Sequence, residues 1–150
     1  MLATLLYVSR SNLSAAAMKP QLPELLSSAR SRNAALDTTG ALVFTGDHFV
    51  QVLEGPVVAL EVLMTSISSD LRHREVQIAL QEPIATRQFD GWSMAYAGPA
   101  EFVRRRVEPL VAAASPEHPL SAQRRTARLL IQLMCEFCDA ASRFKPGTET

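Results

Sequence analysis

The sequence has little glycine and cysteine, no long apolar run and no excess of either charge, and each of these absences argues against a class of protein. It has six glycines and two cysteines in 150 residues, and no glycine-rich loop of the kind that cradles phosphates. No apolar run approaches the roughly 20 residues that cross a bilayer, and the apolar start at 1–8 lacks the basic region of a signal peptide. Basic and acidic side chains balance at 15 each, which argues against nucleic-acid binding through overall charge. We therefore expect a soluble, cytoplasmic protein that binds neither nucleic acid nor membranes.

Motifs for catalysis and metal binding are also missing. The sequence has no nucleophile elbow with an ordered serine, aspartate and histidine, and no acidic pair spaced as metal ligands. Cys135 and Cys138 form a C-x-x-C, but two thiols with no histidine close in sequence do not make a zinc site. We interpret them as ordinary helix residues. We expect no metal site and no enzyme.

The most informative stretch is 47–54, because it contains Gln51. Phe49, Gln51 and Leu53 fall on one face of a predicted strand, and both faces are largely apolar. An amide buried without partners in such a strand costs roughly 1–3 kcal/mol. The pattern therefore predicts a hydrogen-bonding group, from the protein or a ligand, next to Gln51.

The order of predicted elements is β-α-β-β-α-β with one further strand. This order is typical of an α+β, ferredoxin-like sheet with two helices on one face and room for a ligand between them. A pair of helices follows the sheet, which divides the chain into 1–97 and a C-terminal segment, 98–150, that ends in a disordered tail from 146. Having no sheet of its own, the pair must pack on the open sheet face or on another subunit. The predicted strands are 2–9, 38–45, 47–54, 76–80 and 88–96, and the predicted helices are 20–32, 56–73, 101–114 and 120–144.

Several polar side chains should converge on Gln51 in this plan. Tyr7 lies on the first strand, Asn33 at or just past the end of the first helix, and Arg72 and His73 at the end of the second. Each also has an ordinary interpretation. Tyr7 fits a core tyrosine, Asn33 a left-handed helix cap, and Arg72 with His73 basic residues at a helix C-terminus.

Six short segments together resemble a known family. They are LLYVS at 5–9, Asn33 followed by TGAL at 39–42, FVQVLEG at 49–55, DLRH at 70–73, EPI at 82–84 and FDGWSM at 89–94. In this order and spacing, residues 1–97 resemble a BLUF domain, the blue-light sensor that uses flavin adenine dinucleotide (FAD). Residues 98–150 resemble the helical cap of short, stand-alone members.

The resemblance implies a role for individual positions. Tyr7 matches the photoactive tyrosine, Gln51 the switching glutamine, and Asn33 the asparagine that holds the flavin ring. Trp92 and Met94 match two relay residues on the last strand, and the sequence does not decide which of them faces the flavin. The other residues implied in cofactor binding are Leu25, Arg32, Phe49 and Ile67, which line the flavin slot, and Asp70, Arg72 and His73, near the ribityl and phosphate part.

The function implied is that of a blue-light photoreceptor with non-covalently bound FAD. Excited flavin would take an electron and a proton from Tyr7 through Gln51, and the rearranged amide would signal to the C-terminal helices and a partner protein. The apolar stripe of the last helix favours a homo-oligomer, a dimer or larger. Two alternatives stay open: a light-inert ferredoxin-like interaction module in which Gln51 bonds only to protein, and a small acylphosphatase-like hydrolase with an anion bound by arginine and asparagine.

Overall fold

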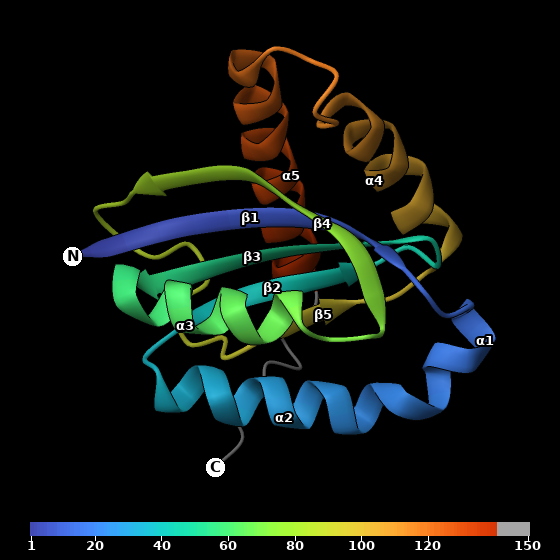
Figure 1. The fold of residues 1–150 in the computed structure, drawn as a ribbon, viewed down its shortest axis with the longest axis horizontal. Helices are drawn as coiled ribbons and strands as arrows, with labels where there is room; N and C mark the ends of the chain where they lie inside the picture. The colour runs from blue at the N-terminus through green and yellow to red at the C-terminus, as the bar shows by residue number, and fades with distance from the viewer. Residues whose placement is uncertain (141–150) are drawn as a thin grey trace.

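The computed structural model describes residues 1–140, with side chains up to residue 137. Its centre is a five-stranded sheet with strand order β4-β1-β3-β2-β5 (Figure 1). The strands are β1 (Leu2–Ser11), β2 (Thr39–Phe44), β3 (His48–Pro56), β4 (His73–Pro83) and β5 (Ala95–Ala97). The helices are α1 (Ala15–Met18), the short 3-10 helix η1 (Lys19–Gln21), α2 (Leu22–Ala35), α3 (Val57–Ser68), α4 (Glu101–Ala113) and α5 (Leu120–Ala140).

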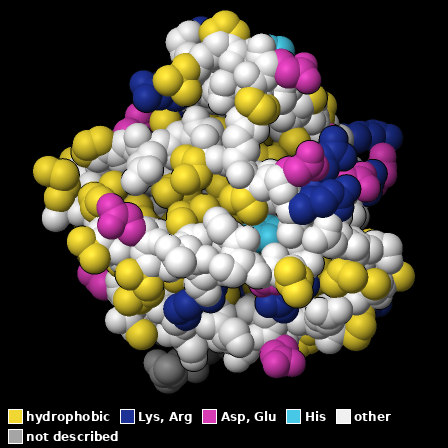
Figure 2. Space-filling view, in the orientation of Figure 1, with side chains coloured by type: hydrophobic (Ala, Val, Ile, Leu, Met, Phe, Trp, Pro, Cys, Tyr) yellow, Lys and Arg dark blue, Asp and Glu magenta, His cyan; other side chains and the backbone are white. Residues whose placement is uncertain are grey.

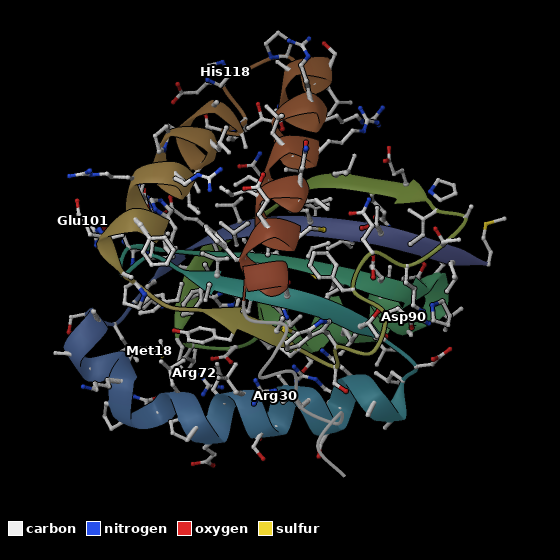
Figure 3. The ribbon with its side chains drawn as sticks, turned by 180° about the vertical axis from the view of Figure 1, so that it is seen from behind. Met18, Arg30, Arg72, Asp90, Glu101 and His118 are labelled. Atoms are coloured by element: carbon white, nitrogen blue, oxygen red, sulfur yellow. The ribbon has the colours of Figure 1, made fainter. Side chains whose placement is uncertain are left out.

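The predicted α+β, ferredoxin-like arrangement is confirmed. The central strands β1 and β3 pair antiparallel, with β4 beside β1 and β2 beside β3. Only β5 pairs parallel, with β2. The helices α2 and α3 lie on one face of the sheet and α5 crosses the other (Figures 1 and 3). No helix in the described part of the chain is long and apolar enough to cross a membrane.

The alternation of side chains along β3 gives the sheet two separate apolar cores. Phe49 and Leu53 belong to the cluster under α2 and α3. Val50 and Val52 belong to the cluster under α4 and α5. Because neighbouring residues of a strand point to opposite faces, β3 is buried on both sides. Gln51 faces the α2 and α3 side, and like its neighbours it is buried.

The C-terminal helices cover the open face of their own sheet. On α5, Leu130, Leu133 and Met134 are buried in the cluster with the β3 valines, while Leu129 stays half exposed. Most of the apolar face of α5 is therefore buried within one chain, so this face gives no argument for a second subunit. The predicted end of this helix at residue 144, the tail from residue 146 and the side chain of Cys138 lie outside the described residues.

The fifth strand is much shorter than the predicted 88–96. Trp92 and Met94 precede β5 in an irregular segment. Gly91 has a φ of 83°, a left-handed conformation that glycine adopts without strain, and Trp92 N–H donates to the Phe89 carbonyl at 3.0 Å. The chain turns at this point, and β5 begins only at Ala95.

Two boundaries near the predicted site also differ. Asn33 lies inside α2, which continues through Ala34 and Ala35, so it is not the left-handed cap. The left-handed residue is Asp37, with a φ of 52°. The second long helix, α3, ends at Ser68, and His73 is the first residue of β4. Strands β1, β3 and β4 are also longer than predicted, and the two short elements α1 and η1 were not predicted.

A buried carboxylate ties the loop after β4 to the central sheet. Glu54 is 1% exposed, and its oxygens accept from the backbone N–H of Gln88 at 2.7 Å and of Phe89 at 2.9 Å. Arg87 donates to the Glu54 carbonyl and to the Thr39 hydroxyl, both at 2.9 Å. This anchor fixes the chain just before the segment that contains Trp92 and Met94.

Replacing Glu54 by glutamine should destabilise the fold. A glutamine amide is neutral and has one oxygen instead of two, so one buried N–H loses its acceptor and the other keeps only an uncharged one. We expect the free energy of unfolding to fall by about 1–3 kcal/mol in urea denaturation. Glu61→Gln, at an exposed position of α3, is the matched control and should stay within about 0.5 kcal/mol of the original protein. Equal stability of the two variants would contradict the anchoring role.

Candidate functional site

A cleft of about 290 Å³ opens between α2 and α3 above the central strands. Figure 2 shows basic side chains and a histidine at the surface on the face that carries these helices. A larger hollow, of about 650 Å³, lies beside α4, but it contains none of the predicted site residues. The cleft is lined by nine of them: Tyr7, Leu25, Arg32, Phe49, Gln51, Ile67, Asp70, Arg72 and His73.

Tyr7 and Gln51 face each other on the two central strands. They are register partners of β1 and β3, so both side chains leave the sheet on the same face. The Tyr7 hydroxyl donates to Gln51 Oε1 at 2.5 Å, and both residues are buried. The predicted hydrogen-bonding neighbour of Gln51 is therefore Tyr7.

The other end of the Gln51 amide points to Met94. Gln51 Nε2 donates to Met94 Sδ at 3.5 Å, and Met94 is 1% exposed. A thioether is a weak acceptor, so this contact is much softer than the bond to Tyr7. Of the two predicted relay residues, Met94 is the one that lies against Gln51, on the α2 and α3 side of the sheet.

Trp92 lies on the opposite side of the sheet. It packs against the cluster of the C-terminal helices and lines a small hollow with Met134 and Phe137 of α5. The turn at Gly91 breaks the strand alternation, and residues 92 and 94 consequently point to different faces. The two predicted relay residues are therefore divided between the two faces of the sheet, with Met94 against Gln51 and Trp92 against α5.

Asn33 does not line the cleft, but it holds the segment beside it. Its Nδ2 donates to the Ser93 carbonyl at 2.8 Å, and it is 1% exposed. One turn earlier on α2, Arg30 Nε donates to the Met94 carbonyl at 3.1 Å. Arg30 is not among the predicted site residues. Its spacing from Asn33, which puts both on one face of a helix, is the signal that could have found it.

Arg32 brings an unpaired donor to the cleft. Its guanidinium reaches across from α2 to the Ser66 hydroxyl of α3, at 3.0 Å. Its Nε is buried and has no hydrogen-bond partner among the described residues. A buried donor without an acceptor is unfavourable, so this atom indicates a ligand that accepts a hydrogen bond.

A charged pair stands at the mouth of the cleft. Arg72 Nε and Nη2 donate to both oxygens of Asp70, at 2.7–3.2 Å, and Arg72 N–H donates to the same carboxylate at 2.9 Å. Hydrogen bonding to Arg72 lowers the pKa of Asp70, against the opposing effect of burial. The pair therefore stays charged at neutral pH and offers a cation near the opening.

His73 closes the wall between β4 and α3. Its Nε2 lies 2.6 Å from the Ile67 carbonyl, which can only accept, so Nε2 carries a proton. Its Nδ1 then accepts from the Ser9 hydroxyl at 2.7 Å in the neutral ring. The ring meets those of Tyr7 and Phe49 edge to face, with centroids 6.0 Å apart. These contacts fix the orientation of the His73 ring, which forms part of the wall of the cleft.

The residues present fit a flat aromatic ring with polar edges. Leu25, Phe49 and Ile67 provide apolar surface, while Gln51 and Arg32 provide hydrogen-bonding groups at its rim. A flavin has this combination of a planar body and carbonyl acceptors. The described residues contain no group of three or more histidine, cysteine or acidic side chains that could hold a metal ion. Lining residues that sequence analysis missed are Ala29, Leu42, Ser66 and Ser69, of which Ala29 follows Leu25 by one helical turn.

A family model described as sensors of blue-light using FAD (BLUF) matches residues 2–95. The blue light- and temperature-regulated antirepressor BluF of Escherichia coli (strain K12) is 36% identical over 89 residues, which cover 59% of this chain and 22% of that protein. The photoactivated adenylate cyclase subunit beta of Euglena longa is 34% identical over 97 residues, 64% of this chain and 11% of that protein. The chain thus spans less than a quarter of either relative.

Solved structures give the same result. The dark-state structure of BlrB, a BLUF protein, is 34% identical with a TM-score of 0.67, covering 83% of this chain and 93% of that one. BlsA in its photo-activated state is similar in fold, with a TM-score of 0.72 over 90% of this chain and 95% of that one at 23% identity. The predicted family resemblance is confirmed.

Both tyrosines of the chain should resist ionisation. Burial, with a smaller contribution from the Asp70 charge, raises the pKa of Tyr7 above its usual value near 10, and burial raises the pKa of Tyr96 to about 12. The folded protein should therefore show almost no tyrosinate absorbance at pH ~10, where free tyrosine is half ionised. The stability that depends on these neutral phenols is complete below pH ~10 and is lost as the pH rises further. Substantial tyrosinate at pH ~10 in the folded protein would contradict the burial.

Proposed function

This chain belongs to the BLUF family, the sensors of blue light using FAD, and we propose that Tyr7 and Gln51 are its light switch. The observation that supports this most is the buried hydrogen bond from Tyr7 to Gln51 Oε1, at 2.5 Å, on the floor of a cleft that fits a flavin. The family is one of flavin-binding sensors rather than enzymes, so the hydrolase alternative has no support.

When bound, the flavin supplies absorption of blue light and an acceptor for one electron. Tyr7 is the residue placed to donate that electron, and its proton can move along the short bond to Gln51. The electron and the proton then return to Tyr7, so the phenol is restored and no bond to the protein forms. The lasting change is the arrangement of the Gln51 amide, by rotation or tautomerisation.

A rearranged amide changes the partner of each neighbour. In the structure Oε1 faces the Tyr7 hydroxyl and Nε2 faces Met94 Sδ. Rotation exchanges these two ends, so that the sulfur meets a carbonyl oxygen, which has no proton to donate. Met94 then loses its contact with Gln51. We propose that this loss is the first step of the signal within the protein.

We also propose that the flavin is FAD, with its phosphates toward the mouth of the cleft. Arg72 provides a positive charge there, and Ser66 and Ser69 provide hydroxyl groups. Arg72 is partly neutralised by Asp70, so the site is suited to a single pyrophosphate more than to a highly charged ligand. The family description names the same cofactor.

Two substitutions test the switch. Blue light should move the flavin absorption bands of the original protein to longer wavelength, with return in the dark. Gln51→Leu and Tyr7→Phe should both keep flavin bound but lose this shift, because one lacks the amide and the other the phenolic proton. Tyr96→Phe, which changes the chain's other tyrosine outside the cleft, should retain the shift. A normal photocycle in Tyr7→Phe would overturn its role.

The output is proposed to pass through α4 and α5 to a partner protein. These helices pack on the opposite face of the strands that carry Tyr7 and Gln51, and Trp92 contacts the α5 cluster from the segment next to Met94. That the protein forms a homo-oligomer stays a prediction. The apolar face of α5 no longer supports it, because that face is largely buried within one chain.

Hydrogen exchange tests this route. We expect blue light to increase exchange in α4 and α5 of the original protein, because the shift of Met94 loosens the segment that packs on them. Gln51→Leu, which lacks the amide, should show no difference between light and dark. Identical exchange of both helices in lit and dark original protein would rule out this route.

A further inference from the structure

The chain between the turn at Gly91 and strand β5 has little support from the sheet. The Trp92 carbonyl accepts from Gly40 N–H of β2 at 3.0 Å. Pairing of β5 with β2 begins only at Ala95 opposite Ala41. Two consecutive carbonyls, those of Ser93 and Met94, lie between these points, and buried carbonyls require donors.

Side chains of α2 provide both donors. Asn33 Nδ2 donates to the Ser93 carbonyl at 2.8 Å, and Arg30 Nε donates to the Met94 carbonyl at 3.1 Å. Figure 3 shows Arg30 on the side of α2 that faces β5. Because the two residues are three apart on one helix, a single rigid element holds both carbonyls.

We infer that Arg30 is a positioning residue that selects the arrangement with Met94 against Gln51 and Trp92 against α5. The Met94 side chain is itself held to Gln51 only by a 3.5 Å contact with a weak acceptor. A bond from a charged guanidinium is stronger than this contact. The backbone anchor, and not the thioether, therefore decides which of the two large side chains lies against Gln51.

This role rests on the proposed function, because it concerns the residue that receives the signal from Gln51. With the Met94 backbone held by α2, a change in the Gln51 amide moves the Met94 side chain first. Without the Arg30 bond, Asn33 still holds the Ser93 carbonyl, but the Met94 backbone is released, and the segment can rearrange so that Trp92 approaches the cleft. In the dark, Arg30 thereby keeps all molecules in one arrangement, with Met94 against Gln51 and Trp92 against α5.

Two variants of nearly equal length separate the hydrogen bond from the bulk of the side chain. In Arg30→Gln, the amide nitrogen is the same number of bonds from Cα as Nε of arginine, so a donor remains. In Arg30→Met, a methyl group takes that place, so the donor is lost. Both variants lose the positive charge, and a difference between them reports the hydrogen bond alone.

Trp92 is the chain's single tryptophan, so its fluorescence reports the arrangement directly. Emission is measured in the dark on protein loaded with FAD, because a flavin quenches a nearby tryptophan. Loss of a bond to a charged donor should shift the balance of arrangements by about tenfold. We expect Arg30→Met to lose Trp92 emission, and Arg30→Gln to resemble the original protein.

Ser31→Ala, on the exposed side of α2, is the control and should leave the emission unchanged. If Arg30→Met does not fold, Arg30→Ala, which favours the helix, takes its place with the same expected loss. Emission equal to that of the original protein in the folded variant without a donor would overturn the inference, as would equal losses in the methionine and glutamine variants. The proposed function is tested separately, by the light-induced shift of the unaltered protein.

Discussion

The register between β1 and β3 is the constraint on which the site depends. It brings the Tyr7 hydroxyl and the Gln51 amide together on one face of the sheet. A slip of one residue in either strand would turn one of them toward α5 and break the pair. The register is protected because both strands are buried on both faces, so a slip would also displace every apolar residue of the two cores.

Strong and weak contacts are distributed unevenly around this pair. Glu54 and Arg87 fix the loop before residue 90, and Asn33 and Arg30 fix the backbone beside Met94. The contact of the Gln51 amide with the Met94 sulfur is the weak one. This distribution suits the proposed switch, because the contact that the proposal requires to break is the weakest one around the pair.

Much of the site could be predicted from local pattern. Gln51 was anomalous because an amide stood in a strand that was apolar on both faces, and its partner Tyr7 was found on the neighbouring strand. The errors came where several short-range preferences competed. Asparagine is common as a cap, but the alanines after Asn33 extend α2, and the hydrogen bond from its amide to the Ser93 carbonyl favours the helix interior. The pattern 88–96 is apolar enough for a strand, but the glycine turn ends it.

The sequence by itself determined the order of elements, the two-faced burial of β3 and the unusual position of Gln51. These follow from periodicity and from the cost of burying a polar group, both of which are local. Only the tertiary structure decided that Met94 lies against Gln51 while Trp92 faces α5, and that Arg30 donates to the Met94 carbonyl. Those outcomes depend on hydrogen-bond donors from a helix some sixty residues earlier in the chain, such as Arg30, which donates to the Met94 carbonyl. A pattern of neighbouring residues cannot predict a contact between residues so far apart in the sequence.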